Sequence, residues 1–430
     1  MGRSIDAVDQ RDGATSLLPD EDAPRKVLSP KRPQTDTAGL ADVFPYYAGF
    51  SYEWARAILS TDANAESAVV LDPWNGSGTT TLAAGASGLR SIGVDLNPVA
   101  NIVARLRIQV GRDSCRCAPP PIAGAASMAL KDPLQAWFSR NAAIRLRQWA
   151  LMLDKMPKAQ STLGLVSLFR VTRQLTSKFG SRNPTWVKRA SSEDDLIDID
   201  HDQLDELIYK DQLGILERLG RESSMMAPSL IMTGSSRRLP LANKSVDLIV
   251  TSPPYLTRID YAVAYSRELA ILGIDIAEDR ALRASLMGTT LIRQDCGASD
   301  EAYGPLAADL IRRVAAHDSK ASRGYYLKQT RQYLDDLAAS LDEITRVSKD
   351  DAVINLVVQD SYYKDVPVRL AEICREEAIR RGWEFDSWEQ FEVNRLLTQV
   401  NTRARAYPKG KVAETVMTLR KMPSCGPRSL

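Results

Sequence analysis

Short apolar runs alternate with helical patterns in two separate parts of the chain. In the first part, strand-like runs at residues 68–71 and 90–94 are each followed by a helical stretch. In the second part, strand-like runs occur at residues 230–234 and 246–250. Strands that alternate with helices are typical of an α/β protein built on a parallel sheet. We therefore predict that the two parts belong to one α/β domain.

The stretch between these two parts does not follow that alternation. Large apolar side chains recur at helical spacing across residues 117–219, which predicts a small helical layer inserted into the α/β domain. Further along, residues 276–325 are interrupted by glycine and other turn-forming residues. This second stretch is predicted to be a mobile loop with short helices.

The C-terminal part completes the pattern. A long helix is predicted at residues 326–347, a strand at 352–358 and a helix at 368–381. Two last strands are predicted at residues 383–385 and 413–419. We expect these two to form an antiparallel hairpin at the end of an otherwise parallel sheet.

The composition is that of a soluble globular protein. Of 430 residues, 44% are hydrophobic and 26% charged, and no apolar run reaches the length of about 18 residues that a membrane span needs. Five scattered cysteines and only two histidines argue against a metal centre or a histidine-based catalytic triad. The N-terminus lacks the apolar segment of a secretory signal, and a reducing cytoplasm is the simplest setting.

Charge is unevenly distributed although the net charge is only +2. A basic block between Arg140 and Arg189 contains Asp154 as its lone acid, and an acidic block follows at residues 193–206. The basic block consists of Arg140, Arg145, Arg147, Lys155, Lys158, Arg170, Arg173, Lys178, Arg182, Lys188 and Arg189. Basic side chains interleaved with aromatic ones suit contacts with nucleic-acid phosphates and bases. A solvated helix surface is the alternative interpretation.

A glycine-rich turn follows the first strand. Asp72 stands at the end of that strand, Gly76 and Gly78 form the turn, and Asp95 ends the second strand. Glycines let a ligand approach the backbone closely, and an acid at the tip of the second strand is placed to accept hydrogen bonds from ribose hydroxyls. The combination predicts a nucleoside-binding βαβ unit. Thr81 stands where a dinucleotide-binding fingerprint has its third glycine, which argues against hydride transfer.

The strand at residues 246–250 runs directly into the sequence Thr-Ser-Pro-Pro-Tyr. Pro253 and Pro254 make the backbone rigid and extended and present carbonyl oxygens without N–H groups. Beside them lie the Ser252 hydroxyl and the Tyr255 ring. This corner could grip a planar ring that carries an amino group. For the tetrapeptide alone, a proline-rich turn with no other role is an equal alternative.

Taken together, these motifs resemble those of the amino-methylating DNA methyltransferases. The segment from Asp72 to Thr80 resembles their motif for S-adenosyl-L-methionine (AdoMet), and residues 251–255 resemble their catalytic motif in its Ser-Pro-Pro-Tyr form. The aromatic segment from Phe44 to Ser51 is similar to the one that precedes the AdoMet motif. The resemblance covers residues 41–110 and 228–421. The serine form is most typical of family members that modify the N4 amine of cytosine.

The resemblance implies a role for each matching residue. Asp72, Gly76 and Gly78 would contact the methionine part of AdoMet, and Asp95 its ribose hydroxyls. The implied cofactor-binding residues are Asp72, Pro73, Gly76, Gly78, Thr79, Asp95, Asn97, Tyr46 and Phe50. The implied catalytic residues are Ser252, Pro253, Pro254 and Tyr255. Ser252 and the Pro253 carbonyl would accept hydrogen bonds from the target amine, while Tyr255 stacks on the base.

Two departures from the family pattern stand out. Ser235 and Ser236 occupy the position after the third strand where relatives usually carry an acid that contacts the cofactor adenine. The helical insertion also precedes the third strand. We predict that this insertion, through Arg182, Lys188 and Arg189, or else the loop at residues 276–325, contacts the target DNA.

The resemblance implies a Rossmann-like class I methyltransferase fold, α/β, with a mostly parallel seven-stranded sheet and a helical insertion. The predicted organisation is a disordered arm at residues 1–38, an AdoMet-binding half at 39–114, the basic helical insertion at 115–227, a catalytic half at 228–421 and a tail at 422–430.

The implied function is site-specific methylation of cytosine N4 in double-stranded DNA, on a flipped-out base. Adenine N6 in DNA, a base nitrogen in RNA, or a silent DNA-binding module are the alternatives. We expect a prokaryotic, nucleoid-associated cytoplasmic protein. No nuclease motif is present, so a cognate restriction endonuclease or other defence-system partner would be a separate protein. No oligomeric state is predicted.

Overall fold

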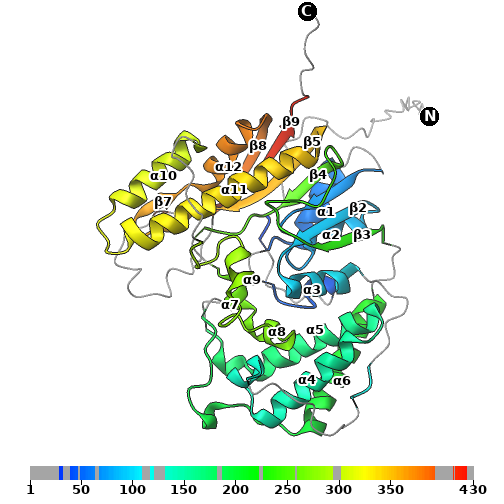
Figure 1. The fold of residues 1–430 in the computed structure, drawn as a ribbon. Coiled ribbons are helices and arrows are strands. Elements are labelled where there is room, and N and C mark those ends of the chain that lie inside the picture. The colour runs from blue at the N-terminus through cyan, green and yellow to red at the C-terminus, as the bar shows by residue number, and fades with distance from the viewer. Residues whose placement is uncertain are drawn as a thin grey trace, which may run out of the picture.

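A seven-stranded sheet forms the centre of the molecule in the computed structural model (Figure 1). The structure describes residues 29–31, 39–46, 49–62, 67–108, 117–120, 131–181, 186–221, 226–256, 259–293, 302–392, 410 and 412–423. The strands lie in the order β3 (Ser229–Thr233), β2 (Arg90–Asp95), β1 (Val69–Asp72), β4 (Val246–Thr251), β5 (Ser348–Gln359), β9 (Ala413–Lys421) and β8 (Trp383–Glu392).

The direction of the strands matches the expected fold. The five strands from β3 to β5 pair in parallel, whereas β9 runs antiparallel to β5, and β8 antiparallel to β9. A separate short hairpin is formed by β6 (Ser361–Tyr363) and β7 (Val366–Val368). The seven-stranded, mostly parallel sheet with helices around it confirms the predicted Rossmann-like fold class.

Helices cover both faces of the central strands, which explains their nearly continuous apolar runs. Val70 of β1 packs with α1 (Tyr52–Asp62) and α2 (Thr79–Ala86) on one face. Leu71, the next residue, points to the other face and joins the core formed by α10 to α12. These helices are α10 (Pro305–Ala316), α11 (Leu327–Val347) and α12 (Leu370–Ile379). The core is thus built on the two-residue alternation of each strand.

The stretch before β3 is helical and lies below the sheet in Figure 1. It contains η2 (Pro133–Ala136), α4 (Arg140–Asp154), α5 (Lys158–Leu175), η3 (Ser177–Phe179), η4 (Glu193–Asp195) and α6 (His201–Arg221). Trp137, Trp149 and Phe169 are buried in its core together with Val103 of α3 (Pro98–Ile108). Because these side chains share one hydrophobic cluster, the helical layer packs directly on the α/β domain.

Two local predictions were wrong in extent. The predicted loop at residues 276–325 contains a regular 12-residue helix, α10, besides the short α9 (Arg280–Ser285) and a π-helical turn (Ser322–Tyr326). The strand predicted at 383–385 continues to Glu392. Apart from Trp388 and Phe391, its later residues are polar because β8 is an edge strand with a solvent-facing side, so the continuous apolar pattern stops before the strand does.

The short helices α7 (Tyr261–Ala264) and α8 (Ser266–Ile271) follow the proline corner and connect the sheet to the helical layer. Leu269 and Ile271 of α8 are buried in the same cluster as the large side chains of that layer. The helices thereby place the segment after β4 between the two parts of the molecule.

Candidate functional site

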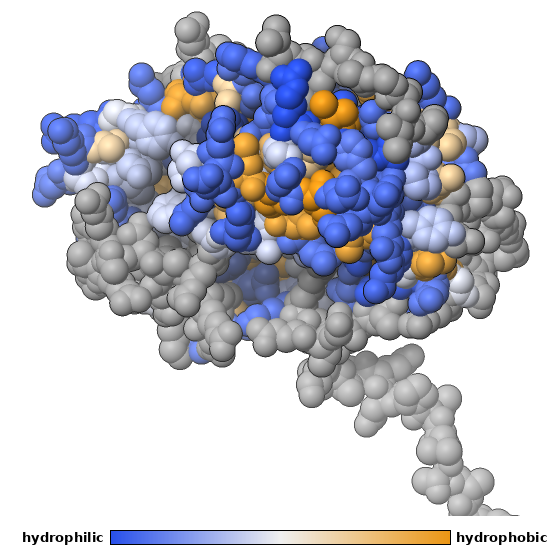
Figure 2. Space-filling view, turned by 90° about the horizontal axis from the view of Figure 1, so that it is seen from below, coloured by the Kyte–Doolittle hydropathy of each residue, from blue (hydrophilic) through white to orange (hydrophobic). Residues whose placement is uncertain are grey.

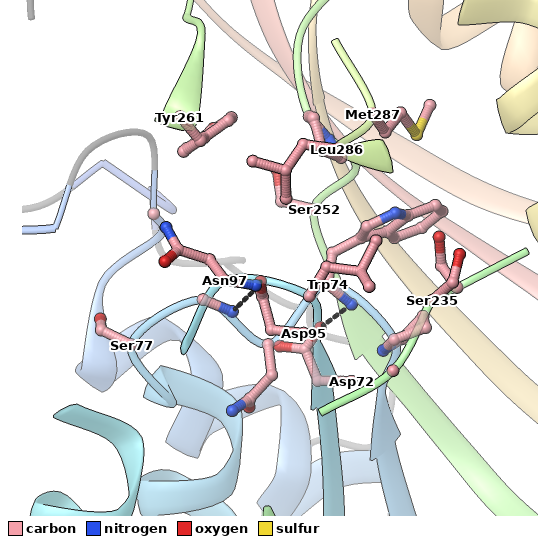
Figure 3. Close-up of a pocket in the computed structure, with 18 of the residues that line it drawn as sticks. Asp72, Trp74, Ser77, Asp95, Asn97, Ser235, Ser252, Tyr261, Leu286 and Met287 are labelled. Atoms are coloured by element: carbon pink, nitrogen blue, oxygen red, sulfur yellow. Dashed lines mark hydrogen bonds between the residues drawn. The ribbon is translucent and has the colours of Figure 1, made fainter. Parts of the chain in front are cut away.

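A pocket of about 870 Å³ lies beyond the carboxyl ends of the central strands and opens to solvent. This is the edge at which doubly wound parallel sheets bind ligands. The predicted site residues that line it are Tyr46, Phe50, Asp72, Pro73, Gly76, Thr79, Asp95, Asn97, Ser252 and Pro254. Figure 3 shows Asp95 and Asn97 on one side of the cavity, with Ser252 and Tyr261 approaching from others. Gly78, Pro253 and Tyr255 lie outside the lining.

The two glycines of the turn are required for different reasons. Both have positive φ, 49° at Gly76 and 83° at Gly78, a region that side chains with a Cβ rarely adopt. A Cβ on Gly76 would lie 2.8 Å from the Tyr46 ring, whereas one on Gly78 would lie 2.7 Å from the Cβ of Ala104 in α3. Gly76 therefore lets an aromatic ring close the pocket, and Gly78 lets α2 pack against α3.

Asp95 closes the glycine turn from the end of β2. Its Oδ2 accepts a hydrogen bond from the Gly76 N–H at 2.8 Å, and its Oδ1 accepts one from the Asn97 N–H at 2.8 Å. Burial raises the pKa of Asp95 to about 6 despite these two bonds. Each carboxylate oxygen keeps further acceptor capacity toward the pocket. The group can therefore receive ligand hydroxyls without giving up its structural bonds.

Asp72 connects the glycine turn to the proline corner. Its Oδ1 accepts from the Thr251 hydroxyl at 2.6 Å and from the Trp74 N–H at 3.1 Å. Its Oδ2 accepts from the Thr80 hydroxyl at 2.7 Å. Burial raises the pKa of Asp72 to about 6. Since Thr251 is the last residue of β4, this carboxylate ties the ends of two neighbouring strands together.

Three buried N–H groups at the pocket have no hydrogen-bond partner among the residues that the structure describes. They are Nε1 of Trp74, Nδ2 of Asn75 and Nδ2 of Asn97. The Asn97 Oδ1 accepts from the Val99 N–H at 3.1 Å, which fixes the orientation of the amide beside the Tyr46 hydroxyl. Buried donors are normally satisfied, so these groups indicate a ligand that offers acceptors. Together with Asp95, the pocket presents both donors and acceptors.

An aromatic stack that the sequence did not predict forms one wall. The Tyr46 ring lies between Tyr265, at a centroid distance of 4.7 Å, and Tyr261, at 6.2 Å. Tyr261 itself lines the pocket, as do Leu286 and Met287 (Figure 3). These residues come from the segments after the proline corner. Nothing in their local sequence distinguishes them from core residues, because their place depends on how α7 and α9 pack.

At the proline corner, Ser252 is partly exposed and lines the pocket. The Pro254 carbonyl accepts a hydrogen bond from the Tyr333 hydroxyl at 2.7 Å. Tyr255 is only 8% exposed. Its predicted role as the stacking surface for a base stays a prediction.

The two serines after β3 line the pocket together with Arg237. Ser236 forms a hydrogen bond with Ser340 of α11 at 2.9 Å between the two hydroxyl oxygens. Arg237 binds Asp336 of α11 at 2.9 Å. Asp336 also binds Arg293 at 2.5 Å, so this nearby acid is fully engaged by two guanidinium groups. It does not replace the acid that the family pattern has after the third strand.

The basic block is less available for phosphate contacts than its sequence indicates. Four of its arginines are bound to carboxylates inside the fold, namely Arg145 with Asp205, Arg147 with Asp132, Arg170 with Asp211 and Arg173 with Glu268. Seen from below, the molecule shows apolar side chains among hydrophilic ones (Figure 2). Leu151 of α4 is 50% exposed and Leu213 of α6 is 38% exposed. The arginines of this block hold the fold together more than they form a basic face.

The three predicted nucleic-acid contacts lie at one end of this layer. Lys188 and Arg189 are exposed, although Arg189 is within 3.4 Å of Asp275. Neither of them lines the main pocket. Arg182 lies outside the described residues. Their contact with DNA therefore stays a prediction.

Among curated proteins, the chain is similar to the Type II methyltransferase M.BsoBI of Geobacillus stearothermophilus, with 22% identity over 283 residues. The matched region is 57% of this chain and 55% of the relative, so the chain spans about half the length of the curated protein it matches. No family model matches the chain.

Similar solved structures include a SAM-dependent methyltransferase from Methanosarcina mazei, with 9% identity and a TM-score of 0.32 over 84% of this chain and 95% of that one. Another is the rRNA methyltransferase aviRa from Streptomyces viridochromogenes, with 11% identity and a TM-score of 0.30 over 90% of each chain. The fold assignment rests on the order and direction of the strands rather than on these likenesses.

Within the described ranges, no helix combines the length and apolarity that crossing a bilayer requires. The same residues contain no cluster of three or more histidine, cysteine or acidic side chains that could hold a metal ion.

Proposed function

We propose that this protein transfers a methyl group from AdoMet to the exocyclic N4 amine of cytosine in DNA. The observation that carries the proposal is that Asp95 and Ser252 line one pocket, and that the Asp72–Thr251 hydrogen bond ties β4 to β1, the strand between β4 and β2. A nucleoside-binding turn and an amine-gripping corner are thus held at one cavity. The likeness to a Type II methyltransferase supports DNA as the acceptor.

The residues present fit AdoMet. The Asp95 carboxylate suits the ribose hydroxyls, and the Asn97 amide suits acceptor atoms of the nucleoside or of the amino-acid carboxylate. Tyr46 and Phe50 supply aromatic surface at the same cavity. When bound, AdoMet supplies an electrophilic methyl group on a positively charged sulfur. Asp72 and Asp95 are the acids of the pocket lining that would face that charge.

The chemical task of the corner is to prepare a poor nucleophile. The lone pair of an exocyclic amine is delocalised into the base ring, so the nitrogen is planar and weakly nucleophilic. The Ser252 hydroxyl and the Pro253 carbonyl would each accept a hydrogen bond from one N–H group of the amine. These two bonds would favour the tetrahedral geometry in which the lone pair is localised. Positioning and fixed dipoles provide the rate enhancement, and no covalent enzyme intermediate is needed.

The position of Ser252 supports a base that leaves the duplex. Ser252 lies in a pocket at the edge of the sheet, walled by Tyr261, Leu286 and Met287, which a stacked base could not enter. Enzymes that modify a base atom in this way turn the nucleotide out of the helix. The apolar side chains then exclude water from the acceptor nitrogen.

The direct test is methyl transfer with identification of the product. The protein is incubated with isotopically labelled AdoMet and with amplified, unmethylated duplex DNA, single-stranded DNA or RNA, and the nucleosides are then separated. We expect N4-methylcytosine from DNA. N6-methyladenine alone would contradict the choice of cytosine, product from RNA alone would contradict the choice of DNA, and no product with any substrate would favour a silent binding module.

Ser252→Ala tests the corner itself. We expect it to lower kcat by about 10- to 100-fold, because one of the two acceptors is lost, while AdoMet affinity stays within about twofold. Ser245→Ala is the matched control, since Ser245 precedes the same strand at its other end and its hydroxyl bonds only the Ala242 carbonyl among the described residues. Full methyl transfer by Ser252→Ala would show that the corner has been misassigned.

A further inference from the structure

The proline corner extends beyond the sheet that should hold it. The last ladder pair of β4 with β5 joins Thr251 to Leu356. Beyond that pair, Pro253 and Pro254 have no N–H group, so the backbone cannot donate a hydrogen bond to any neighbour there. The atoms that would grip the amine, on Ser252 and Pro253, therefore need another means of support.

Two side-chain hydrogen bonds provide that support, one on each side of the gripping atoms. Before them, the Thr251 hydroxyl donates to Asp72 Oδ1 at 2.6 Å. After them, the Tyr333 hydroxyl donates to the Pro254 carbonyl at 2.7 Å. Ser252 and Pro253 are thus bracketed by bonds to two different parts of the molecule.

Tyr333 is well suited to be a permanent donor. It lies within α11, is 1% exposed, and belongs to the core formed with Leu334 and Leu337. Burial raises the pKa of its hydroxyl well above the ordinary value of 10.0, so the group keeps its proton at neutral pH. A buried hydroxyl without a partner would cost about 1–3 kcal/mol, so the bond to Pro254 also satisfies the tyrosine.

The same bond decides which carbonyl remains available. The Pro254 oxygen is occupied by Tyr333, while within the described part of the chain the Pro253 oxygen accepts no hydrogen bond. The Pro253 carbonyl is thus the unoccupied one next to the Ser252 hydroxyl, although Pro253 is buried and only its neighbours Ser252 and Pro254 line the pocket. Without Tyr333, two adjacent carbonyls would compete for the same N–H.

We propose that Tyr333 is a positioning residue for methyl transfer, which holds the Pro254 carbonyl and thereby leaves Ser252 and Pro253 as the pair that orients the amine. This role rests on the function proposed above. Tyr333 acts through the backbone of the corner and does not touch the base. Its loss should therefore affect turnover more than the binding of AdoMet.

The test is Tyr333→Phe in the full-length protein, which removes the hydroxyl and keeps the ring in the core. We expect kcat under saturating AdoMet and DNA to fall about tenfold, as a small displacement of reacting groups does. The Kd for AdoMet, measured calorimetrically, should change by less than about twofold, since one neutral hydrogen bond distant from the cofactor residues is removed. Tyr363→Phe is the control, because Tyr363 is also buried and its hydroxyl bonds Ser319 and Ser322 away from the pocket.

A second pair of variants tests the other hydrogen bond that supports the corner, the one from Thr251 to Asp72. Thr251→Val removes the bond to Asp72 with almost no change in volume, and Thr251→Ser retains the donor. We expect the valine variant to lose turnover as Tyr333→Phe does and the serine variant to recover most of it.

The outcomes are distinct. An unchanged kcat in Tyr333→Phe, beside an active wild type, overturns the role of Tyr333 and leaves the methyltransferase proposal standing. If kcat falls and both the AdoMet affinity and the urea midpoint of unfolding fall with it, the positioning role of Tyr333 is overturned in favour of a general structural role. If Tyr333→Phe does not fold, equal activity of Thr251→Val and Thr251→Ser overturns the claim that side-chain hydrogen bonds to the corner position Ser252 and Pro253. A wild type that methylates no nucleic acid overturns both proposals.

Discussion

The two sides of the pocket are supported in different ways. On the side of the proposed cofactor site, called the cofactor side below, Asp95 bonds Gly76 and Asn97, residues 19 and 2 positions away along the chain. On the corner side, Tyr333 lies 79 positions from Pro254, and Asp72 lies 179 positions from Thr251. The cofactor side is thus held largely by its own short segment, whereas the corner depends on distant elements. Substitutions within the glycine turn should therefore lower AdoMet affinity and stability. Substitutions in the distant elements that hold the proline corner should mainly lower kcat.

The largest effect is expected from a single added methyl group on the cofactor side. Gly78→Ala places a Cβ 2.7 Å from Ala104 Cβ and 2.9 Å from the Thr81 hydroxyl at a φ of 83°. The clash and the strained backbone should together lower the free energy of unfolding by about 3 kcal/mol or more. Urea denaturation measures this change.

Gly88→Ala separates the two causes. Gly88 has a similar φ of 77°, but a Cβ there has no atom within 4 Å. We expect it to cost only about 1–2 kcal/mol, from backbone conformation alone. Equal losses at the two positions would show that crowding between α2 and α3 is not what requires Gly78.

Asp95→Asn should separate binding from turnover. The amide keeps the shape but replaces one acceptor oxygen by a donor, which would face the Gly76 or Asn97 N–H. We expect AdoMet affinity to fall about 10- to 100-fold, the usual range for a lost charge-assisted hydrogen bond. Turnover at saturating AdoMet should change much less. Calorimetry and steady-state kinetics together check this, and an unchanged Kd would remove Asp95 from the cofactor site.

AdoMet binding should weaken in mild acid. Asp72 and Asp95 both have a pKa raised to about 6 by burial, and their ionised forms suit the positive charge and the hydroxyls of the ligand. Below about pH 6, each group that must be ionised should raise Kd by up to about tenfold per pH unit. Calorimetric titrations between about pH 5 and about pH 8 would show the effect, and Asp95→Asn should reduce the slope. A flat profile would contradict it.

In the protein without ligand, the same two raised pKa values make the folded state more stable in acid, whereas AdoMet binding becomes weaker there. Both acids have folded-state pKa values above the ordinary 3.8, so the folded state binds more protons than the unfolded state between these values. Their contribution to stability is present below about pH 4 and is lost as the pH rises through about 6.

The smallest effect is expected from the exposed basic residues of the helical layer. Replacement of Lys188 and Arg189 by glutamate should lower DNA affinity and reduce the salt dependence of binding by about 0.9 per lost phosphate contact, with kcat at saturating DNA unchanged. Lys210→Glu on the exposed side of α6 is the control. DNA affinity and salt slope equal to the wild type would show that this end of the layer does not contact DNA.

The contrast between the two sides also explains what the sequence could predict. The glycine turn, Asp95 and Ser252 are recognisable because strand, turn and helix signals surround them in the chain. Tyr261, Met287 and Tyr333 are not, since their positions at the site depend on the packing of α7, α9 and α11. The sheet was predictable from apolar runs buried on both faces, and the end of β8 was not, because an edge strand needs no apolar residues on its outer side.

The basic block shows the same limit for charge. In the sequence its arginines resemble a nucleic-acid-binding surface. The carboxylates that neutralise Arg145 and Arg173 lie 60 and 95 positions away, so the sequence does not show that these arginines have partners. Residue composition reports how many charges a segment has. It does not report which of them already have partners.

The ion pair between Arg173 and Glu268 bears on whether the protein can be reduced in size. Glu268 is fully buried at the start of α8, and Arg147 caps the other end of that helix by donating to the carbonyls of Ala270 and Ile271. Removal of residues 131–221 would take away the partners of Glu268 and of the Ala270 and Ile271 carbonyls, and would expose Leu269 and Ile271, which pack in the same hydrophobic cluster as that layer. The helical layer is therefore not a detachable module, and a shortened protein would have to be redesigned at α8.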